Sequence, residues 1–509
     1  MAFEIELKLA IDPAQISALN RLPLIKSAGG TRAATAQIYS VYYDTPDNAL
    51  RESGAALRLR RVRSRWIQTL KRGGRVEAGL HQREEIDTPV PAQMLNFPAL
   101  QAAGGNDVLA DAAVLRTIAP VFVTDFKRTT RQLEPLPGTH IEFCLDRGSI
   151  SGGNRHAAIS EIELELKSGS PAHIIDFALE LVQRVPLRLE AASKAQRGYA
   201  LIEGREDAPM KADTPELLPD LSVEAAFRTI VFDCVNHLQG NERGLRENDD
   251  PEYLHQARVA LRRLRSAFTV FKPAFPGVFF AQTAAELRWL GSVLGPARDW
   301  DVFADDSLAR VIADFPDEPS LHAAAAHAAS LRDSSRLGVR EAVASSRYTT
   351  LLLQLIGVFL RAPWAQTSDA SAQERERPLL EFARRLLERR HESVRKHGRH
   401  LQQLDRAALH ELRIRVKRLR YACEFLGSLF EKKAVRQYTR ELAGLQSLLG
   451  TINDATTAQR LSQALAQNEH ADSPEAVGLL RGWHAARASG SVARLPQAWK
   501  RFKSCEVFW

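Results

Sequence analysis

The first segment of the chain, Glu4-Ile5-Glu6-Leu7-Lys8, alternates charged and apolar residues, and this pattern limits how it can fold. In a β-strand, successive side chains point to opposite faces, so Glu4, Glu6 and Lys8 share one face. Such a face suits the wall of a wet cavity that holds a metal and an anion better than an apolar core. Similar alternation recurs in Leu57–Arg60 and Glu161–Leu166. Strands of this kind predict a β-barrel with an ionic interior.

The pattern changes along the chain. Residues 1–205 are rich in alternating, strand-like segments separated by turn signals. Residues 206–221 contain Pro209, Pro215 and Pro219 and are predicted to be a linker. Residues 222–509 have helical periodicity and are rich in Ala, Leu and Arg. We therefore predict an α+β multidomain protein, with a barrel followed by an all-α bundle.

The helical part contains a tandem repeat. His255–Arg265 matches His410–Arg420, and Glu286–Asp299 matches Glu441–Asp454, both at an offset of 155 residues. Two separate matches at one offset indicate a duplication. The repeats are predicted at about residues 222–370 and 376–509.

Composition excludes several classes of protein. The 509 residues are 45% hydrophobic and 26% charged, as is typical of globular domains, and exceed what one core holds. Long apolar runs and a signal-like leader are missing, so we expect no membrane association. The four cysteines are scattered and predict reduced thiols in a cytoplasmic protein. The net charge of +8 is compatible with an anionic partner without identifying one.

The charged strand faces suggest a phosphate site. Glu4 and Glu6, facing Glu161 and Glu163 with Asp146 nearby, would offer oxygen ligands for Mg²⁺ or Mn²⁺. Basic residues would clamp phosphate oxygens, namely Lys8, Arg58, Arg60, Lys71 and Arg128. This set suits phosphoryl transfer to water. The alternative is a group of solvated strands joined by cross-strand ion pairs.

Each helical repeat also presents a cationic stripe. On a helix that begins near His255, Arg258, Arg262 and Arg265 fall within about 80° of one another, with apolar residues behind them. His410, Arg413, Lys417 and Arg420 repeat this layout. Two such faces would form a groove for a linear polyanion, whereas the alternative is a solvated helix surface. We expect the histidines to strengthen binding below about pH 6.5.

The N-terminal motifs resemble the CYTH family, the triphosphate tunnel metalloenzymes, and within it the bacterial inorganic triphosphatases. The matching segments are Glu4-x-Glu6-x-Lys8, Tyr42-Tyr43-Asp44-Thr45-Pro46-Asp47, Leu57–Arg60, Thr69-Leu70-Lys71, Gly79-Leu80-His81-Gln82-Arg83, Thr124-Asp125-Phe126, Glu161-x-Glu163-x-Glu165 and Ser193-Lys194-x-x-Arg197-Gly198-Tyr199. The resemblance implies a tunnel of eight antiparallel strands that hydrolyses tripolyphosphate to diphosphate and phosphate with Mg²⁺ or Mn²⁺.

The resemblance also implies roles for individual residues. The implied metal ligands are Glu4, Glu6, Asp146, Glu161 and Glu163, and the implied triphosphate ligands are Lys8, Arg58, Arg60, Lys71, Arg128 and Lys194. The catalytic residues would be Glu6, Lys8, Arg58 and Arg60, with Glu6 as the candidate for orienting the attacking water. Two points stay open: whether Glu84 or Glu85 takes the family's acidic position, and whether Glu165 is a ligand.

The repeats resemble the CHAD family, which is associated with inorganic polyphosphate. The shared pattern is His-x-x-Arg-x-x-x-Arg-Arg-Leu-Arg followed by Leu-Gly-x-x-x-Asp. The implied polyphosphate-binding residues are His255, Arg258, Arg262, Arg263, Arg265, His410, Arg413, Lys417, Arg418 and Arg420. A CYTH domain (1–205) followed by a CHAD domain (222–509) is a familiar bacterial order.

Three alternatives to a polyphosphate-docked inorganic triphosphatase stay open. The barrel would hydrolyse thiamine or nucleoside triphosphates or act as a cyclase on ATP, or the chain would be a non-catalytic protein of polyphosphate granules. Nucleic-acid binding is disfavoured, because the stripes hold only His, Arg and Lys, without the amides and aromatic platforms that read bases.

Overall fold

The computed structural model describes residues 3–27, 33–77, 79–105, 109–204, 208–275, 277–366, 370–465 and 474–509. The chain forms two compact units. We call them the barrel unit (Met1–Ala208 with Ala344–Ala362) and the helical unit (Pro209–Val343 with Pro363–Trp509). The predicted domain limits at 205 and 222 remain predictions, and residues 206–207 of the predicted linker lie outside the described residues.

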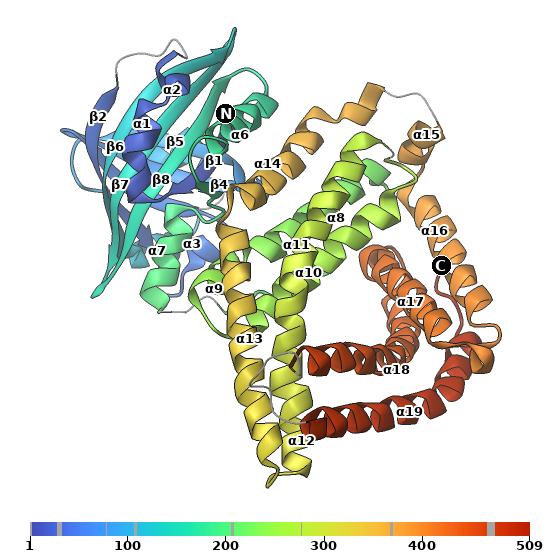
Figure 1. The fold of residues 1–509 in the computed structure, drawn as a ribbon. Helices are drawn as coiled ribbons and strands as arrows, with labels where there is room; N and C mark the ends of the chain where they lie inside the picture. Colours follow the sequence, from blue (N-terminus) through green and yellow to red (C-terminus); the bar gives the residue numbers. More distant parts are fainter. Residues whose placement is uncertain are drawn as a thin grey trace. The chain divides into compact units, whose positions relative to one another are not determined.

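Eight antiparallel strands close into a barrel, which confirms the predicted fold class of this part (Figure 1). The order is β5-β4-β3-β2-β6-β7-β8-β1, and β1 pairs again with β5 to close the ring. A short β9 adds to β1. The strands are β1 Phe3–Ile11, β2 Ala34–Asp44, β3 Ala56–Val62, β4 Arg65–Glu77, β5 Leu80–Val90, β6 Ala119–Leu136, β7 Thr139–Gly152, β8 Arg155–Ser168 and β9 Leu187–Leu189.

The alternation of apolar and charged residues along the strands decides which side chains lie on the apolar face of the sheet and which on the charged face. Leu57 and Leu59 of β3 are fully buried, and Leu57 packs in an apolar cluster with Leu70 and Ile86. The alternate residue Arg58 belongs to the opposite face, which the charged residues share. The helices of this unit are α1 Ile16–Arg21, α2 Pro23–Ser27, α3 Ala49–Glu52, α4 Phe97–Leu100, α5 Ala112–Thr117, α6 Pro171–Val182, α7 Lys194–Glu203 and α14 Ser346–Arg361.

Helix α7 packs against β6, β7 and β8 and begins at a charged residue of the barrel interior, Lys194. Its start is fixed by a capping box, in which Ser193 and Gln196 bond to each other's backbone N–H. The helix also approaches the barrel closely at Gly198. A Cβ at this glycine would lie 2.2 Å from the Phe122 ring, so no other residue fits without a shift.

The substitution Gly198→Ala should therefore destabilise the barrel unit and move Lys194. Overpacking of this kind costs about 1–3 kcal/mol, which urea unfolding measures. Gly444→Ala is the matched control, because Gly444 lies in a helix with open space around it. The control should be neutral or stabilising by about 0.5–1 kcal/mol. Equal stability of the two variants would contradict this account.

Helix α14 lies near the end of the predicted first helical repeat (222–370) but packs in the barrel unit. It contacts α6 and β9, and the Thr349 hydroxyl donates a hydrogen bond of 2.8 Å to the carbonyl of Leu187 in β9. Most of its apolar side chains are buried, including Leu352 and Ile356. The barrel unit is therefore built from two separate stretches of the chain.

The helical unit confirms the predicted all-α region, and its helices can be compared at the repeat offset of 155 residues. Equivalent helices of the two repeats are α8 and α16, α10 and α17, α11 and α18, and α13 and α19. Their bounds are α8 Val223–Gln239, α9 Glu242–Glu247, α10 Pro251–Phe271, α11 Val278–Val302, α12 Ala309–Asp314, α13 Pro319–Ala344, α15 Ala370–Glu376, α16 Leu379–His397, α17 Arg406–Leu426, α18 Lys432–Leu465 and α19 Pro474–Ser504. Among the described helices, none is by itself long and apolar enough to cross a membrane, and one bent pair meets the criterion jointly.

Candidate active site and cationic helices

The charged side chains of the barrel unit meet in the barrel interior. Lys71 of β4 contacts Glu4 of β1 at 2.5 Å, although β5 lies between these strands. Arg58 of β3 similarly contacts Glu85 of β5, at 2.9 Å, across β4. Contacts between strands that are not neighbours require a shared inner face. The structure thus brings the predicted acidic and basic residues of the barrel into one enclosed network.

One part of this network is a buried acidic cluster, Asp146 of β7 with Glu161 and Glu163 of β8. One oxygen from each carboxylate lies within 4.8 Å of the others. Lys194 reaches all three, with Nζ 2.7 Å from Asp146 and 2.8 Å from Glu163, and a shorter contact to Glu161. Arg128 donates two hydrogen bonds to Asp146, of 2.8 and 2.6 Å, and a third to Glu163.

Two further predicted residues connect to this cluster. Lys8 Nζ lies 2.6 Å from Glu163 and 2.7 Å from Glu6, so its ammonium links Glu6 to the acidic cluster. Register explains the contact, because Lys8 is paired directly with Glu163 across β1 and β8. Arg60 lies beside Ser40, its neighbour across β2 and β3, with Nε 3.3 Å from the hydroxyl.

The second part of the network surrounds Glu4 and Glu85. Lys71 Nζ bridges them, at 2.5 Å from Glu4 and 3.0 Å from Glu85. Glu84 instead pairs with Arg72, at 2.9 Å. The register that pairs Lys71 with Glu85 therefore places Glu85, and not Glu84, in the interior. Glu165 of β8 accepts a hydrogen bond from the partly exposed Lys167 and takes no part in the acidic cluster.

The carboxylates differ in how readily they ionise. Burial disfavours the charge of Glu163, but Lys194, Lys8 and Arg128 hold its pKa well below the usual range. Burial is likewise outweighed at Asp146, where Lys194 and Arg128 lower the pKa. At Glu4, burial outweighs the attraction of Lys71 and raises the pKa to about 7. At Glu6, burial and the negative charge of Glu163 together raise the pKa. The interior thus combines readily ionised carboxylates with carboxyl groups that hold a proton more strongly.

The acidic cluster fits a divalent metal in its donor chemistry. Three buried carboxylates within 4.8 Å supply the hard oxygen ligands that Mg²⁺ and Mn²⁺ prefer. The Lys194 ammonium contacts the same three carboxylates, so a cation bound there would require Lys194 to turn away. Of the other predicted metal ligands, Glu6 is linked to this cluster by the Lys8 ammonium, which contacts both Glu6 and Glu163. Glu4 instead pairs with Lys71.

Sequence reasoning assigned no role to three interior residues, although His81, Arg83 and Arg197 belong to the segments that resemble the CYTH family. His81 is buried, its Nε2 has no hydrogen-bond partner, and burial with the charges of Lys8 and Arg83 lowers its pKa to about 2. Arg83 faces Glu6 and Glu4, and Arg197 donates to Glu161 at 2.7 Å. The alternation His81, Arg83, Glu85 along β5 is the signal that would have found the first two.

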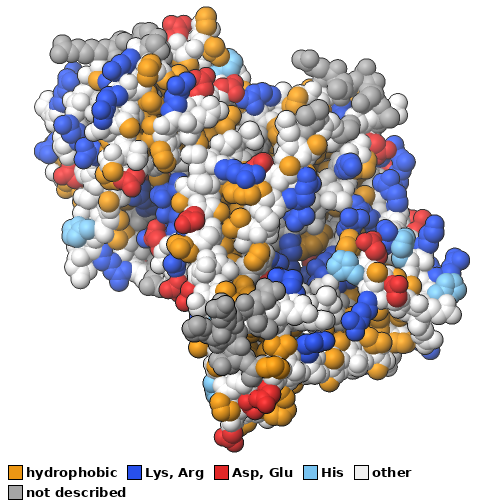
Figure 2. All heavy atoms as spheres, in the orientation of Figure 1, with side chains coloured by type: hydrophobic (Ala, Val, Ile, Leu, Met, Phe, Trp, Pro, Cys, Tyr) orange, Lys and Arg blue, Asp and Glu red, His pale blue; other side chains and the backbone are white. Residues whose placement is uncertain are grey.

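The two cationic stripes of the helical unit converge. Helices α10 and α17 contact each other, and Arg262 of α10 acts electrostatically on both Arg413 and Lys417 of α17. We call Arg258, Arg262, Arg413 and Lys417 the cationic crossing. On the face drawn in Figure 2, blue Lys and Arg side chains gather in the hollow near these helices. Burial, Arg413 and Arg262 together lower the pKa of Lys417 to about 8.

The other predicted stripe residues lie around or away from this crossing. His255 is close to Arg258 and Arg262, and burial with the charge of Arg298 lowers its pKa. His410 contacts Asn453 through Nδ1, at 2.8 Å, and Arg420 pairs with Glu424 at 2.7 Å. Arg265 and Arg418 are exposed. Arg263 is 4% exposed and pairs with Asp233 at 3.0 Å, so the structure does not bring it to the crossing.

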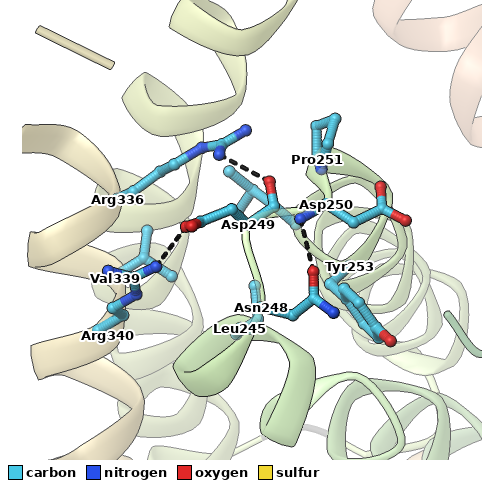
Figure 3. A pocket seen from close by; sticks show the side chains of 10 residues that line it. Leu245, Asn248, Asp249, Asp250, Pro251, Tyr253, Arg336, Val339 and Arg340 are labelled. Atoms are coloured by element: carbon cyan, nitrogen blue, oxygen red, sulfur yellow. Dashed lines mark hydrogen bonds and ion pairs between the residues drawn. The ribbon is translucent and has the colours of Figure 1, made fainter. Parts of the chain in front are cut away.

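A separate small pocket lies where α10 begins (Figure 3). Its cavity is about 20 Å³, room for a single water molecule. Arg340 of α13 pairs with the Asp249 carboxylate at 2.5 Å, and Arg336 donates to the Asp249 carbonyl at 2.7 Å. These contacts connect α13 to the start of α10, and the pocket lies at the junction of these two helices.

Comparison with known proteins assigns both units. The sequence model of the CYTH domain matches residues 2–199, and that of the CHAD domain matches residues 229–463. The crystal structure of the CHAD domain from the plant Ricinus communis is 33% identical, with a TM-score of 0.53, and the match covers 59% of this chain and 99% of that one. The chain belongs to the CYTH and CHAD families.

Two relatives extend this assignment. An inorganic triphosphatase of Haemophilus influenzae is 36% identical over 210 residues, 40% of this chain. The match spans about half of that relative, 55% of its length. An uncharacterized protein of Mycobacterium tuberculosis is 26% identical over 473 residues, which cover 88% of this chain and 86% of that protein. The latter match extends across both the CYTH and CHAD regions.

Proposed function

We propose that the CYTH barrel hydrolyses inorganic tripolyphosphate to diphosphate and phosphate with a divalent metal. The observation that carries the proposal is the interior set of three clustered carboxylates and surrounding buried cations. The CYTH match and the triphosphatase relative support it. An enclosed site lined by both charges suits a metal-bound polyanion, since the cations bind phosphate and the carboxylates bind metal.

In this proposal, the ion-paired side chains of the barrel interior would change partners when metal and substrate bind. Asp146, Glu161 and Glu163 would hold Mg²⁺ or Mn²⁺, which supplies charge stabilisation and orientation for phosphoryl transfer. Lys194 and Arg128, released from these carboxylates, would bind phosphate oxygens together with Lys8, Arg58, Arg60 and Lys71. Glu6 would orient the attacking water, because its raised pKa makes it a stronger proton acceptor than Glu163, whose pKa is lowered.

Phosphate release from tripolyphosphate, with and without Mg²⁺ or Mn²⁺, tests this function. Thiamine triphosphate and ATP measured alongside decide between the hydrolase alternatives. Metal-dependent turnover that Glu6→Gln loses would support the proposal. Absence of turnover with all three substrates would overturn it and favour the non-catalytic alternative.

For the helical unit we propose binding of long-chain inorganic polyphosphate at the cationic crossing, with polyphosphate granules as the site of docking in the cytoplasm. Both repeats contribute cations there, and the buried Nε atoms of Arg262 and Arg413 have no hydrogen-bond partners. Polyphosphate carries closely spaced charge without bases, which suits a site made of cations. Competition between polyphosphate and duplex DNA at rising salt separates the two ligands, and preference for DNA would overturn the proposal.

Polyphosphate affinity should fall as the pH rises through the pKa of Lys417. This pKa is lowered to about 8 in the free protein, and a bound polyanion should return it toward its usual value of about 10. Binding therefore takes up a proton, and affinity should drop about tenfold between about pH 7 and pH 9. Calorimetric titrations across this range measure the change. Lys417→Arg, which keeps its charge, should flatten the profile, whereas equal slopes would contradict the assignment.

A further inference from the structure

Two aspartates border the cationic crossing and have no role in the proposed function so far. Asp299 of α11 and Asp454 of α18 are equivalent in the two repeats, since both end the shared Leu-Gly-x-x-x-Asp segment. Asp299 Oδ1 lies 3.9 Å from Arg258 Nη2. Asp454 acts on Arg413 and Lys417, and the two aspartates act on each other. Each repeat thus adds one carboxylate to the edge of the crossing.

The surroundings of Asp299 and Asp454 indicate that these carboxylates contribute little to the free energy of unfolding. The Asp299 side chain is 31% exposed, its contact with Arg258 is long, and Asp454 is exposed. Exposed ion pairs of this kind contribute about 0–1 kcal/mol. Asp299 also pairs with Arg460 of the second repeat, at 3.1 Å, a contact that an asparagine oxygen can still accept. Their negative charge, in contrast, lies where an anionic ligand must bind.

We infer that Asp299 and Asp454 are built-in counter-charges that limit the affinity of this site and restrict it to long polyanions. The inference rests on the proposed polyphosphate binding. Every anion must compete with the aspartates for these cations, but a long chain can contact all four cations at once, whereas a single phosphate contacts only some of them. The aspartates therefore penalise short anions more than long ones, and they keep the bound chain exchangeable.

The test compares Asp454→Asn, Asp299→Asn and the double variant with the unaltered protein. Dissociation constants are measured for long-chain polyphosphate and for orthophosphate at several salt concentrations. Each variant should bind polyphosphate about three- to tenfold more tightly, and the gain for orthophosphate relative to polyphosphate should be larger. The slope of the logarithm of affinity against the logarithm of salt concentration should steepen by up to about one for each cation that loses its aspartate neighbour.

Asp317→Asn is the matched control, because it makes the same charge change at an exposed position in the loop before α13. Tighter binding and steeper salt dependence in the two test variants, without change in the control, support the inference. Unchanged or weaker binding in the variants overturns it and leaves the proposed function intact. Failure of every form, the unaltered protein included, to bind polyphosphate overturns both.

Discussion

Replacing Glu163 by glutamine should reduce metal-dependent tripolyphosphate hydrolysis about a thousandfold. Glu163 belongs to the acidic cluster and contacts Lys8, Arg128 and Lys194, so in the proposed function its charge would both bind the metal and position the cations. Charge stabilisation by a bound metal contributes several kcal/mol, and about 4 kcal/mol corresponds to three factors of ten in rate. Initial rates of phosphate release at saturating metal measure the loss.

Glu165→Gln provides the matched control for this prediction. Glu165 lies two residues further along β8 and contacts Lys167 near solvent, outside the acidic cluster. Its substitution should change the rate by less than about twofold, consistent with a surface ion pair. Glutamine keeps the shape and one acceptor oxygen of Glu163, and circular dichroism verifies the fold. A folded Glu163→Gln variant with more than a tenth of the original rate would contradict the assignment.

The sequence predicted the ionic interior because alternation alone decides which face a strand residue belongs to. Glu4, Glu6, Lys8, Arg58 and Arg60 follow directly from this rule. The rule fails where two neighbouring residues are both acidic. Glu84 and Glu85 were separable only by the pairing of Lys71 with Glu85 across β4 and β5, which is a property of the assembled sheet.

The helical unit shows a second limit of sequence reasoning. Helical spacing predicted that Arg258, Arg262 and Lys417 lie on cationic stripes, and in the structure all three are half-buried. The repeat offset of 155 residues relates α10 to α17. Arg263 has the same chemistry but is buried against Asp233, since the position after Arg262 turns about 100° around the helix. Likewise, nothing in the apolar pattern of α14 indicated that it packs in the barrel unit, because amphipathicity identifies a buried face but not its partner.

Replacing Lys194 by methionine should destabilise the barrel unit by about 3–5 kcal/mol in the absence of metal. The ammonium contacts Asp146, Glu161 and Glu163, and these carboxylates are almost fully buried. Removing one partner from a buried ionic group leaves charge uncompensated, which is a strongly destabilising change. Urea unfolding, followed by hydrogen exchange in β7 and β8, measures the effect where it arises. Lys167→Met, a change at a side chain that is 42% exposed, should have little effect.

Added Mg²⁺ or Mn²⁺ should recover much of this stability, and the recovery distinguishes a metal site from a purely structural ion network. In the unaltered protein a metal must displace the Lys194 ammonium, whereas in the methionine variant the three carboxylates have lost that competitor. The metal should therefore bind the variant more tightly and raise its unfolding free energy more, since stabilisation grows with the ratio of metal concentration to dissociation constant. A variant destabilised equally with and without metal would show that the acidic cluster serves Lys194 alone. Recovery of stability on addition of metal would instead mean that the Lys194 ammonium occupies the metal position in the metal-free protein. Lys194 would leave that position when it binds phosphate.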